Sequence, residues 1–359
     1  MSVRFGIIGT GRISDWVLKG AVLEPRFIAA AVCSRSEENA IVFASRHNIP
    51  KTFTDIGQMA SDPTIDAIYI GTPNHTHHDI AIECMSHGKH VLCEKPLASN
   101  AREVREMIAA ARDNGVVLME AMISTLSPNF RMVRERVRTL GAVRHYSGTF
   151  CQFSSKFDLL KRILSGEEDS PVPSSFNPER SGGALMDIGI YPIYPMVTLF
   201  GPPKSVSANV TTCKVPTSEG LKDIDLQGCA TFEYDGMSAT AMYSKIADSR
   251  LRTEISCEGG ILSLDQIHIT RQVDFIPHGA PTSGRSSGPS KEDITVPCDP
   301  DEYLCEFKEF IDVIEDGRKE SANNSLANSL AVAEIMDEIR RQAKVTFPAD
   351  QAGALPSTT

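Results

Sequence analysis

The chain has 359 residues, of which 41% are hydrophobic and 23% are charged, and its formal net charge is -10. This length exceeds the size at which one hydrophobic core stops growing, so we expect more than one domain. The acidic balance, with no long basic run, gives no support to nucleic-acid binding. The nine cysteines are dispersed and never form a C-x-x-C pair, which is typical of reduced thiols in a cytosolic protein.

The N-terminus enters a strand pattern at once, so we expect no signal peptide. No apolar run approaches the ~20 residues that a membrane helix needs. These two observations predict a cytoplasmic protein without a membrane as partner, and the acidic charge predicts no nucleic-acid partner.

Strand and helix patterns alternate through the first third of the chain. The runs that predict strands are Val3 to Ile8, Phe27 to Val32, Ile65 to Ile70, His90 to Cys93 and Val116 to Met119. The runs that predict helices are Ile13 to Glu24, Glu37 to His47, Asp79 to His87 and Arg102 to Asn114. Alternation of this kind predicts βαβ units in a parallel sheet, and the continuous hydrophobicity of the strands indicates that both faces are covered.

The alternation of strands and helices ends at about residue 122. Beyond it, longer strand patterns joined by tight turns predict a large, mostly antiparallel open sheet. Its expected strands are Ala142 to Phe153, Ser205 to Lys214, Gln227 to Tyr234, Met237 to Lys245, Arg252 to Cys257 and Gly260 to Leu264, followed by helices at Glu302 to Glu315 and Leu326 to Gln342. We therefore expect an α/β chain with a Rossmann-type domain at 1–122, an α+β substrate and dimerisation domain at 123–347, and a loose tail at 348–359. A Gly, Ser and Pro-rich loop at 279–291 is expected to be mobile or laid on the surface.

A glycine turn lies between the first strand and the first helix. Glycines at this place let the backbone approach a pyrophosphate, which then meets the free N–H groups of the helix N-terminus. The third glycine of the usual pattern is replaced here by Ser14, which is still small enough for close helix packing. The residues expected to contact a dinucleotide are Gly9, Thr10, Gly11, Arg12 and Ile13.

The end of the second strand favours NADP(H) over NAD(H). An NAD site has a carboxylate here, whereas this chain has no acid before Glu37 and presents Ser34 and Arg35 instead. A guanidinium can pair bidentately with a 2′-phosphate. The alternative is a solvated arginine at the start of a helix, with Ser34 or Ser36 as the N-cap.

Three histidines, at 75, 77 and 78, follow the third predicted βαβ strand. A metal site is the weaker interpretation, because no Cys, Asp or Glu stands at ligand spacing, and we expect no metal. The loop is instead expected to lie over the nicotinamide half of a cofactor, with contacts from Thr72, Pro73, Asn74 and His77.

Lys95 follows the apolar run that ends the fourth of these strands. Ligands of open α/β sheets bind beyond the carboxyl ends of the strands, where a lysine can polarise a substrate oxygen. Pro96 fixes the backbone and turns the chain there, and Glu94, Lys95 and Pro96 are expected to border the cofactor. In isolation a surface turn lysine would be the better interpretation.

A second polar group is predicted at Gly182 to Tyr191. If this segment is helical, Asp187 and Tyr191 are four residues apart and share one face. Taken alone, Asp187 as a helix cap and Tyr191 as a half-buried core residue would be an equally good interpretation.

Five segments, in their order and spacing, resemble the Gfo/Idh/MocA family of oxidoreductases over essentially the whole chain. They are Gly9 to Gly11, Gly71 to His77, Glu94 to Pro96, Leu118 to Ala121 and Gly182 to Tyr191. A tyrosine at 191, where many members have histidine, resembles the branch of dimeric dihydrodiol dehydrogenase and NADP-dependent D-xylose dehydrogenase. The resemblance implies a Rossmann domain, an open sheet often used for dimerisation, NADP(H), and a sugar, polyol or diol substrate. The residues expected to contact the substrate are Glu120, Ile123, Phe150, Phe153 and Tyr191.

One segment departs from the family pattern. Relatives have an aromatic residue and an arginine before the proline that follows Glu-Ala, whereas this chain reads Met122 to Pro128 without either. Because that stretch lines the substrate pocket in the family, the departure leaves the identity of the substrate open.

The expected reaction is hydride transfer between nicotinamide C4 and a carbon that bears a hydroxyl or carbonyl. Tyr191 is the expected acid/base, since a nearby Lys95 ammonium would favour its ionised form. Lys95 would also stabilise a developing alkoxide, with Asp187 orienting Lys95 or a substrate hydroxyl. Two alternatives stay open: Lys95 itself is the base, or the chain is a redox-inactive dinucleotide-binding sensor of the same fold.

Overall fold

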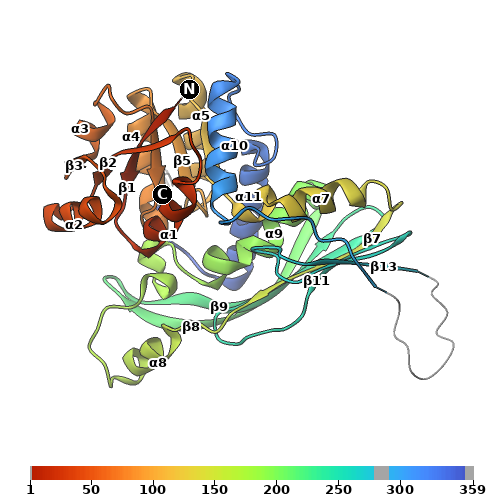
Figure 1. Ribbon diagram of the computed structural model, residues 1–359. Coiled ribbons are helices and arrows are strands. Elements are labelled where there is room, and N and C mark those ends of the chain that lie inside the picture. Colours follow the sequence, from red (N-terminus) through yellow and green to blue (C-terminus); the bar gives the residue numbers. More distant parts are fainter. Residues whose placement is uncertain (1, 279–290, 352–359) are drawn as a thin grey trace. The chain divides into compact units, whose positions relative to one another are not determined.

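The structure is a computed structural model that describes residues 2–278 and 291–351 (Figure 1). The chain divides into two compact units: unit 1 is Met1–Leu126 with Asp299–Ala333, and unit 2 is Ser127–Cys298 with Glu334–Thr359. Of the expected loop at 279–291 only Lys291 is described, and of the expected tail only 348–351. There Pro348–Asp350 forms a short 3-10 turn, and Asp350 accepts a hydrogen bond from Arg340 at 2.7 Å.

Unit 1 contains a six-stranded parallel sheet in the order β3-β2-β1-β4-β5-β6. Its strands are β1 (Val3–Ile8), β2 (Phe27–Cys33), β3 (Lys51–Phe53), β4 (Ala67–Ile70), β5 (His90–Glu94) and β6 (Leu118–Ala121). The strand order reverses at β1, which pairs with β2 on one side and β4 on the other. Ligands of such sheets bind at this switch point, beyond the carboxyl ends of the strands. The expected parallel sheet is confirmed, with β3 as an edge strand that the sequence pattern did not predict.

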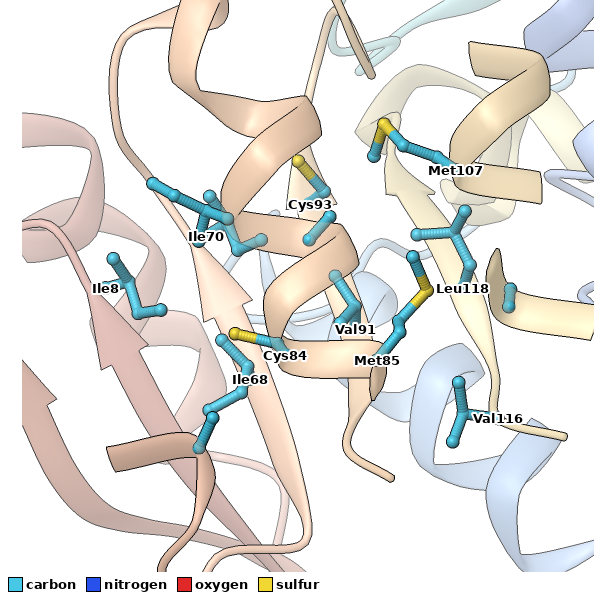
Figure 2. Close-up of a cluster of buried hydrophobic side chains, with 14 of the residues drawn as sticks. Ile8, Ile68, Ile70, Cys84, Met85, Val91, Cys93, Met107, Val116 and Leu118 are labelled. Atoms are coloured by element: carbon cyan, nitrogen blue, oxygen red, sulfur yellow. The ribbon is translucent and has the colours of Figure 1, made fainter. Parts of the chain in front are cut away.

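Helices cover both faces of this sheet, as the apolar strands require. They are α1 (Arg12–Ala21), α2 (Glu37–His47), α3 (Ile56–Ala60), η1 (Asn74–Thr76), α4 (His77–Ser86), α5 (Ala101–Asp113), α6 (Ile123–Leu126) and α10 (Leu304–Glu315). One core forms where α4 and α5 pack on the central strands. Figure 2 shows its side chains, among them Ile68, Ile70, Met85, Val91 and Met107, all of them fully buried or nearly so.

Helix α10 packs on the β1–β2 part of the sheet through aromatic side chains. The Phe307 ring lies 5.4 Å from the Phe5 ring and 5.0 Å from the Phe27 ring, and Phe310 lies 5.9 Å from Phe5. Residues 299–333 therefore belong to unit 1, whereas we expected them in the second domain. The reason is that the buried aromatic face of α10 finds its partners about 300 residues earlier in the chain.

Unit 2 is built on an eight-stranded sheet in the order β14-β13-β12-β11-β7-β10-β9-β8. Its strands are β7 (Val143–Cys151), β8 (Ser205–Thr217), β9 (Gly220–Glu233), β10 (Ser238–Ser244), β11 (Thr253–Cys257), β12 (Gly260–Leu264), β13 (Val273–Pro277) and β14 (Glu292–Asp293). All neighbours pair antiparallel except β7 and β10, which are parallel. The expected large, mostly antiparallel sheet is confirmed (Figure 1).

The helical elements of unit 2 include a short π-helical turn, η4. They are α7 (Pro128–Val137), α8 (Phe157–Ser165), η2 (Ser174–Phe176), η3 (Pro178–Arg180), η4 (Leu185–Gly189), α9 (Ile190–Phe200) and the later part of α11 (Leu326–Ala343). Wider turns of this kind are rare and occur frequently at functional sites.

One segment is more apolar than we expected from the sequence. Pro178–Phe200 is long and apolar enough to cross a membrane by length and composition alone, so the expectation that no run approaches that length is wrong. Within the protein 72% of its apolar window is buried. A core helix of a folded domain passes the same test, so the segment is weak evidence for a membrane span.

Candidate active site

The glycine turn after β1 brings two strand ends into close contact. Gly9 has φ +105°, a conformation that favours glycine. A Cβ on Gly9 would lie 2.5 Å from the carbonyl oxygen of Gly71, which follows β4. Gly71 in turn donates its N–H to Ile8 O at 2.9 Å. The turn is therefore held at the switch point of the sheet, where the sequence predicted it.

The space in front of Gly11 fits a pyrophosphate. Gly11 is the N-cap of α1, no side chain caps the helix there, and a Cβ on Gly11 would meet nothing within 4 Å. Ser14, one turn into α1, is fully buried, and its Oγ has no hydrogen-bond partner among the described residues. Uncapped N–H groups with open space in front of them are what an anionic phosphate needs. The residues present here fit a dinucleotide.

The end of β2 presents Arg35 to solvent. Arg35 is exposed, and Ser36 caps α2 by accepting a hydrogen bond from the Asn39 N–H at 3.2 Å. Ser34 Oγ accepts from the Ser36 N–H at 3.4 Å. The capping alternative is thus correct for Ser36, and the Arg35 side chain is exposed to solvent.

His77 links two loops instead of presenting a ring nitrogen to a ligand. The ring is fully buried, with Nδ1 3.0 Å from the Pro96 carbonyl oxygen and Nε2 2.8 Å from the Thr72 carbonyl oxygen. Burial lowers the pKa of His77 from its ordinary value. The expectation that His77 contacts a cofactor directly is not met, because both nitrogens face backbone carbonyls. Thr72, Pro73 and Asn74 are partly exposed in the same loop, so for them the expectation stays open.

Lys95 stands directly beyond the carboxyl end of β5. Its backbone N–H donates to Glu94 Oε2 at 3.3 Å, and the peptide bond to Pro96 is cis. Glu94 is buried, and its Oε1 accepts a hydrogen bond from the Tyr69 hydroxyl at 2.8 Å. Burial raises the pKa of Glu94, and the neighbouring Lys95 charge opposes that rise. Lys95 is therefore a partly exposed cation above a buried carboxyl.

Glu120 anchors the loop after Lys95 and is not open to a substrate. Only 2% of Glu120 is exposed, and its Oε1 accepts the Leu97 N–H at 3.0 Å. Burial raises the pKa of Glu120 to about 7, against a hydrogen bond from Ser329. Ile123 in α6 is 5% exposed. The expected substrate contacts of these two residues are corrected, because their side chains are enclosed by the protein.

In unit 2, Asp187 forms an ion pair with Lys245, which the sequence reasoning missed. The Lys245 ammonium donates to Asp187 Oδ2 and lies 5.6 Å from the centre of the Phe176 ring. Asp187 sits in the π-helical turn η4, which Asp225 holds by accepting the Leu185 N–H at 2.6 Å. Burial raises the pKa of Asp225 to about 6. The turn therefore presents the half-exposed carboxylate of Asp187, which is already paired with the Lys245 ammonium.

Tyr191 lies in an aromatic group that includes two of the predicted substrate contacts. Its ring meets the Phe150 ring edge-on at 5.4 Å, and Phe150 stacks on His268 at 4.0 Å. His268 also meets Tyr191 at 5.9 Å. Phe153 is not part of this group, since it is exposed and packs against Phe157. A mixed aromatic surface with a phenol and an imidazole suits a ring-shaped, polar molecule.

Profiles of two domain families match the chain. Residues 3–122 match the oxidoreductase family with an NAD-binding Rossmann fold, and residues 130–263 match the GFO/IDH/MocA C-terminal domain. The chain is also 41% identical over 350 residues to scyllo-inositol 2-dehydrogenase (NADP(+)) IolU of Bacillus subtilis (strain 168), covering 98% of this chain and all of the relative. The chain belongs to the Gfo/Idh/MocA family.

Other members of the family agree with the branch expected from Tyr191. Trans-1,2-dihydrobenzene-1,2-diol dehydrogenase of Xenopus laevis is 33% identical over 365 residues, covering 97% of this chain and all of the relative. The solved structure of a levoglucosan dehydrogenase in complex with NADH and levoglucosan matches with a TM-score of 0.80 at 22% identity, covering 96% of this chain and 98% of that one. This likeness confirms the fold.

Within this Gfo/Idh/MocA chain, the predicted residues fall into two groups. Gly9, Gly11, Thr72 and Lys95 gather at the carboxyl ends of the strands of unit 1, whereas Asp187, Tyr191 and Phe150 gather in unit 2. The missed residues are Lys245 and His268. Lys245 ends a predicted strand, and this position was the signal that could have indicated a site residue. The local sequence pattern around His268 gave no indication of the site.

Proposed function

We propose that the chain is an NADP(H)-dependent dehydrogenase that oxidises a hydroxyl carbon of a cyclic polyol, sugar or diol, or reduces the corresponding carbonyl. The observation that carries this proposal is the end-to-end similarity to an NADP(+)-dependent scyllo-inositol dehydrogenase. The glycine turn and the uncapped start of α1 support binding of a dinucleotide. Exposed Arg35, in place of a carboxylate, supports the phosphorylated form.

The bound nicotinamide supplies the hydride acceptor or donor. During oxidation the carbon loses a hydride and its hydroxyl loses a proton, so a protein group must take that proton. Tyr191 is the proposed acceptor, with Lys95 donating a hydrogen bond to the substrate oxygen as its charge develops. Asp187, held by Lys245, is proposed to orient a second substrate hydroxyl.

The aromatic group of unit 2 supports a ring-shaped substrate. Phe150 and His268 stack on each other and Tyr191 meets both edge-on, so the group offers aromatic surface on which the apolar C–H side of a cyclohexane or pyranose ring could pack. The half-exposed Asp187 carboxylate can accept hydrogen bonds from ring hydroxyls. We therefore propose scyllo-inositol as the first substrate to assay, followed by pyranoses and trans-diols.

The proposal also includes a cytoplasmic homodimer that acts on small molecules and not on nucleic acid or membranes. All nine cysteines are free, which suits a reducing compartment. Residues 205–212 of β8 alternate between exposed and half-buried, so one face of this edge of the sheet is available to a second copy. Light scattering of the purified protein tests the dimer.

Formation of NADPH absorbance with scyllo-inositol and a panel of sugars and diols tests the reaction. The expected result is steady turnover with NADP⁺, and turnover at least 10²-fold lower in Lys95→Met with NADPH affinity kept. Lys51→Met is the matched control, because Lys51 is a half-exposed lysine of unit 1 tied to Asp62 at 2.7 Å. Tight NADPH binding without turnover of any compound would instead favour the sensor, and unchanged turnover in Lys95→Met would exclude the assigned role.

A further inference from the structure

Three consecutive residues of β9 are buried, which is unusual for a strand. Ile224, Asp225 and Leu226 are 0%, 2% and 7% exposed, although successive side chains of a regular strand point to opposite faces of the sheet. The pairing with β8 skips Leu226, because its neighbours Asp225 and Gln227 are opposite two adjacent residues of β8. The strand therefore has a β-bulge at Leu226. Bulges of this kind re-aim side chains and are frequent beside active sites.

The side chain of Asp225 takes the place of a helix cap for the π-helical turn η4. Ala184, the N-cap residue of η4, makes no side-chain capping hydrogen bond, and the N–H groups at the start of a helix need an acceptor. Asp225 Oδ2 supplies one from 40 residues away in the chain by accepting the Leu185 N–H at 2.6 Å. The first turn of η4 is thus fixed to β9.

Gly183 lets the Asp225 carboxylate approach the backbone that precedes η4. Its φ is +111°, and a Cβ at this position would overlap Asp225 Oδ1. The Gly183 N–H donates to Ser175 O at 3.0 Å, and the Gly183 carbonyl oxygen accepts the Asp187 N–H at 3.1 Å. Asp225 therefore lies against the residue whose carbonyl holds the backbone of Asp187.

The bulge also holds Lys245, the partner of Asp187 in the ion pair. Leu226 O accepts the backbone N–H of Lys245 at 2.9 Å, and Lys245 O accepts the Ser154 N–H at 2.9 Å. The backbone of Lys245 is therefore fixed on both sides. One bulge thus reaches both members of the ion pair, through Asp225 on the side of η4 and through Leu226 on the side of Lys245.

We propose that the β9 bulge sets the geometry of the Asp187–Lys245 pair and that Asp225 is a positioning residue for the Asp187 carboxylate. The inference rests on the proposed function, which assigns that carboxylate to a hydroxyl of the substrate. Asp225 is itself buried, so it acts through the backbone of η4 and not on the substrate. Loss of its carboxylate should weaken recognition of the polyol and leave the binding of NADP(H) intact, because the proposed cofactor contacts lie in unit 1.

Hydrogen exchange of the substrate-free protein, followed by mass spectrometry, tests the anchor. In Asp225→Ala the peptide that covers 183–191 is expected to exchange at least about tenfold faster, because η4 loses its acceptor and opens locally. Asp225→Asn keeps an acceptor oxygen and should stay within about threefold of the parent protein. Unchanged exchange of 183–191 in Asp225→Ala would overturn the proposal. This result needs no turnover, so it distinguishes failure of this inference from failure of the proposed function.

Steady-state kinetics test the positioning role. Asp225→Ala is expected to lower kcat/KM for the polyol about tenfold, the effect of one misplaced charge-assisted hydrogen bond, with KM for NADP⁺ within about twofold. Asp225→Asn should recover most of the activity. The matched control is Asp274→Ala, which removes another buried carboxylate of the same sheet, paired with Lys291 at 3.0 Å, and should leave kcat/KM nearly unchanged. Equal losses in Asp225→Ala and Asp274→Ala would show general destabilisation and refute the role of Asp225.

A double-mutant cycle tests whether Asp225 acts through Asp187. If it does, adding Asp225→Ala to Asp187→Asn should change kcat/KM by less than about twofold, because the carboxylate to be positioned is already gone. Losses that multiply would contradict the proposal. If Asp225→Ala does not fold, the Leu185 amide of the parent protein decides: it should be protected from exchange at least about 10²-fold, and exchange at the rate of a free amide would exclude the anchor.

Discussion

Lys245 and Asp187 form an ion pair in which the lysine side chain is 9% exposed and the aspartate side chain 37% exposed. The lysine also lies over the Phe176 ring. The pair fixes a carboxylate in the π-helical turn just before Tyr191. A side chain that the sequence suggested as a partner of Lys95 thus has a cation of its own within unit 2.

Removal of this cation should lower activity more than stability. Lys245→Met leaves Asp187 partly hydrated, so we expect a loss of only about 1 kcal/mol in the free energy of unfolding. kcat/KM for the polyol should fall about tenfold, the effect of one lost charge-assisted hydrogen bond. Thermal unfolding and steady-state kinetics measure the two effects. Lys245→Arg should recover most of the activity, and a fully active Lys245→Met would show that the pair does not serve the reaction.

The two glycines of the β1–α1 turn should respond differently to an added methyl group. Gly9→Ala forces a Cβ to within 2.5 Å of a backbone oxygen at a positive φ, so we expect a loss of stability of at least about 1–3 kcal/mol. Gly11→Ala meets open space and should leave Tm nearly unchanged, but its methyl group occupies the volume offered to the pyrophosphate. NADPH titration of both proteins should show weakened binding in Gly11→Ala. Normal NADPH affinity in Gly11→Ala would place the phosphates elsewhere.

Arg35 should decide between the two nicotinamide cofactors. Arg35→Ala removes a charge-assisted pair with the 2′-phosphate, worth about 1.5–3 kcal/mol, so KM for NADP⁺ should rise roughly 10-fold to 100-fold. KM for NAD⁺ should change little. Arg46→Ala is the control, since Arg46 lies in the last turn of α2, the helix that follows Arg35, and is tied to Asp15 at 2.8 Å. Parallel changes with both cofactors would show that Arg35 does not discriminate between them.

Glu120 should make stability depend on pH. Its pKa is about 7 in the folded protein against an ordinary value of 4.5, so the folded state binds more protons between these values. Stability contributed by the neutral form is complete below about pH 4.5 and is lost as the pH rises through 7, by on the order of 3 kcal/mol. Glu120→Gln keeps the acceptor for Leu97 and should flatten this part of the curve. Urea unfolding across pH 4.5 to 8 measures the slope, and an unchanged slope would contradict the assignment.

The fold could be predicted largely from local patterns, whereas the site could be predicted only in part. Buried parallel strands such as Val3–Ile8 are continuous apolar runs, and helix α2 begins and ends at signals within its own sequence. Glu120 and His77 were misassigned because their polar side chains look available in the sequence. Their burial depends on backbone groups of Leu97, Thr72 and Pro96, which no local pattern reveals.

Residues that act at a distance in the chain were missed for the same reason. His268 lies in the loop between β12 and β13 and stacks on Phe150. The sequence around His268 has no hydrophobic periodicity that would predict this contact. Lys245 could be recognised as a site residue only from the structure, in which the π-helical turn places Asp187 beside it.

The ring of His77 joins the Thr72 carbonyl of the loop after β4 to the Pro96 carbonyl of the loop after β5. These two hydrogen bonds of a buried ring hold the two loops together. Any adjustment that a bound molecule forces on the loop of Thr72 is therefore transmitted to the backbone that carries Lys95. We therefore expect a molecule bound at the loop of Thr72 to affect the backbone beside Lys95 as well.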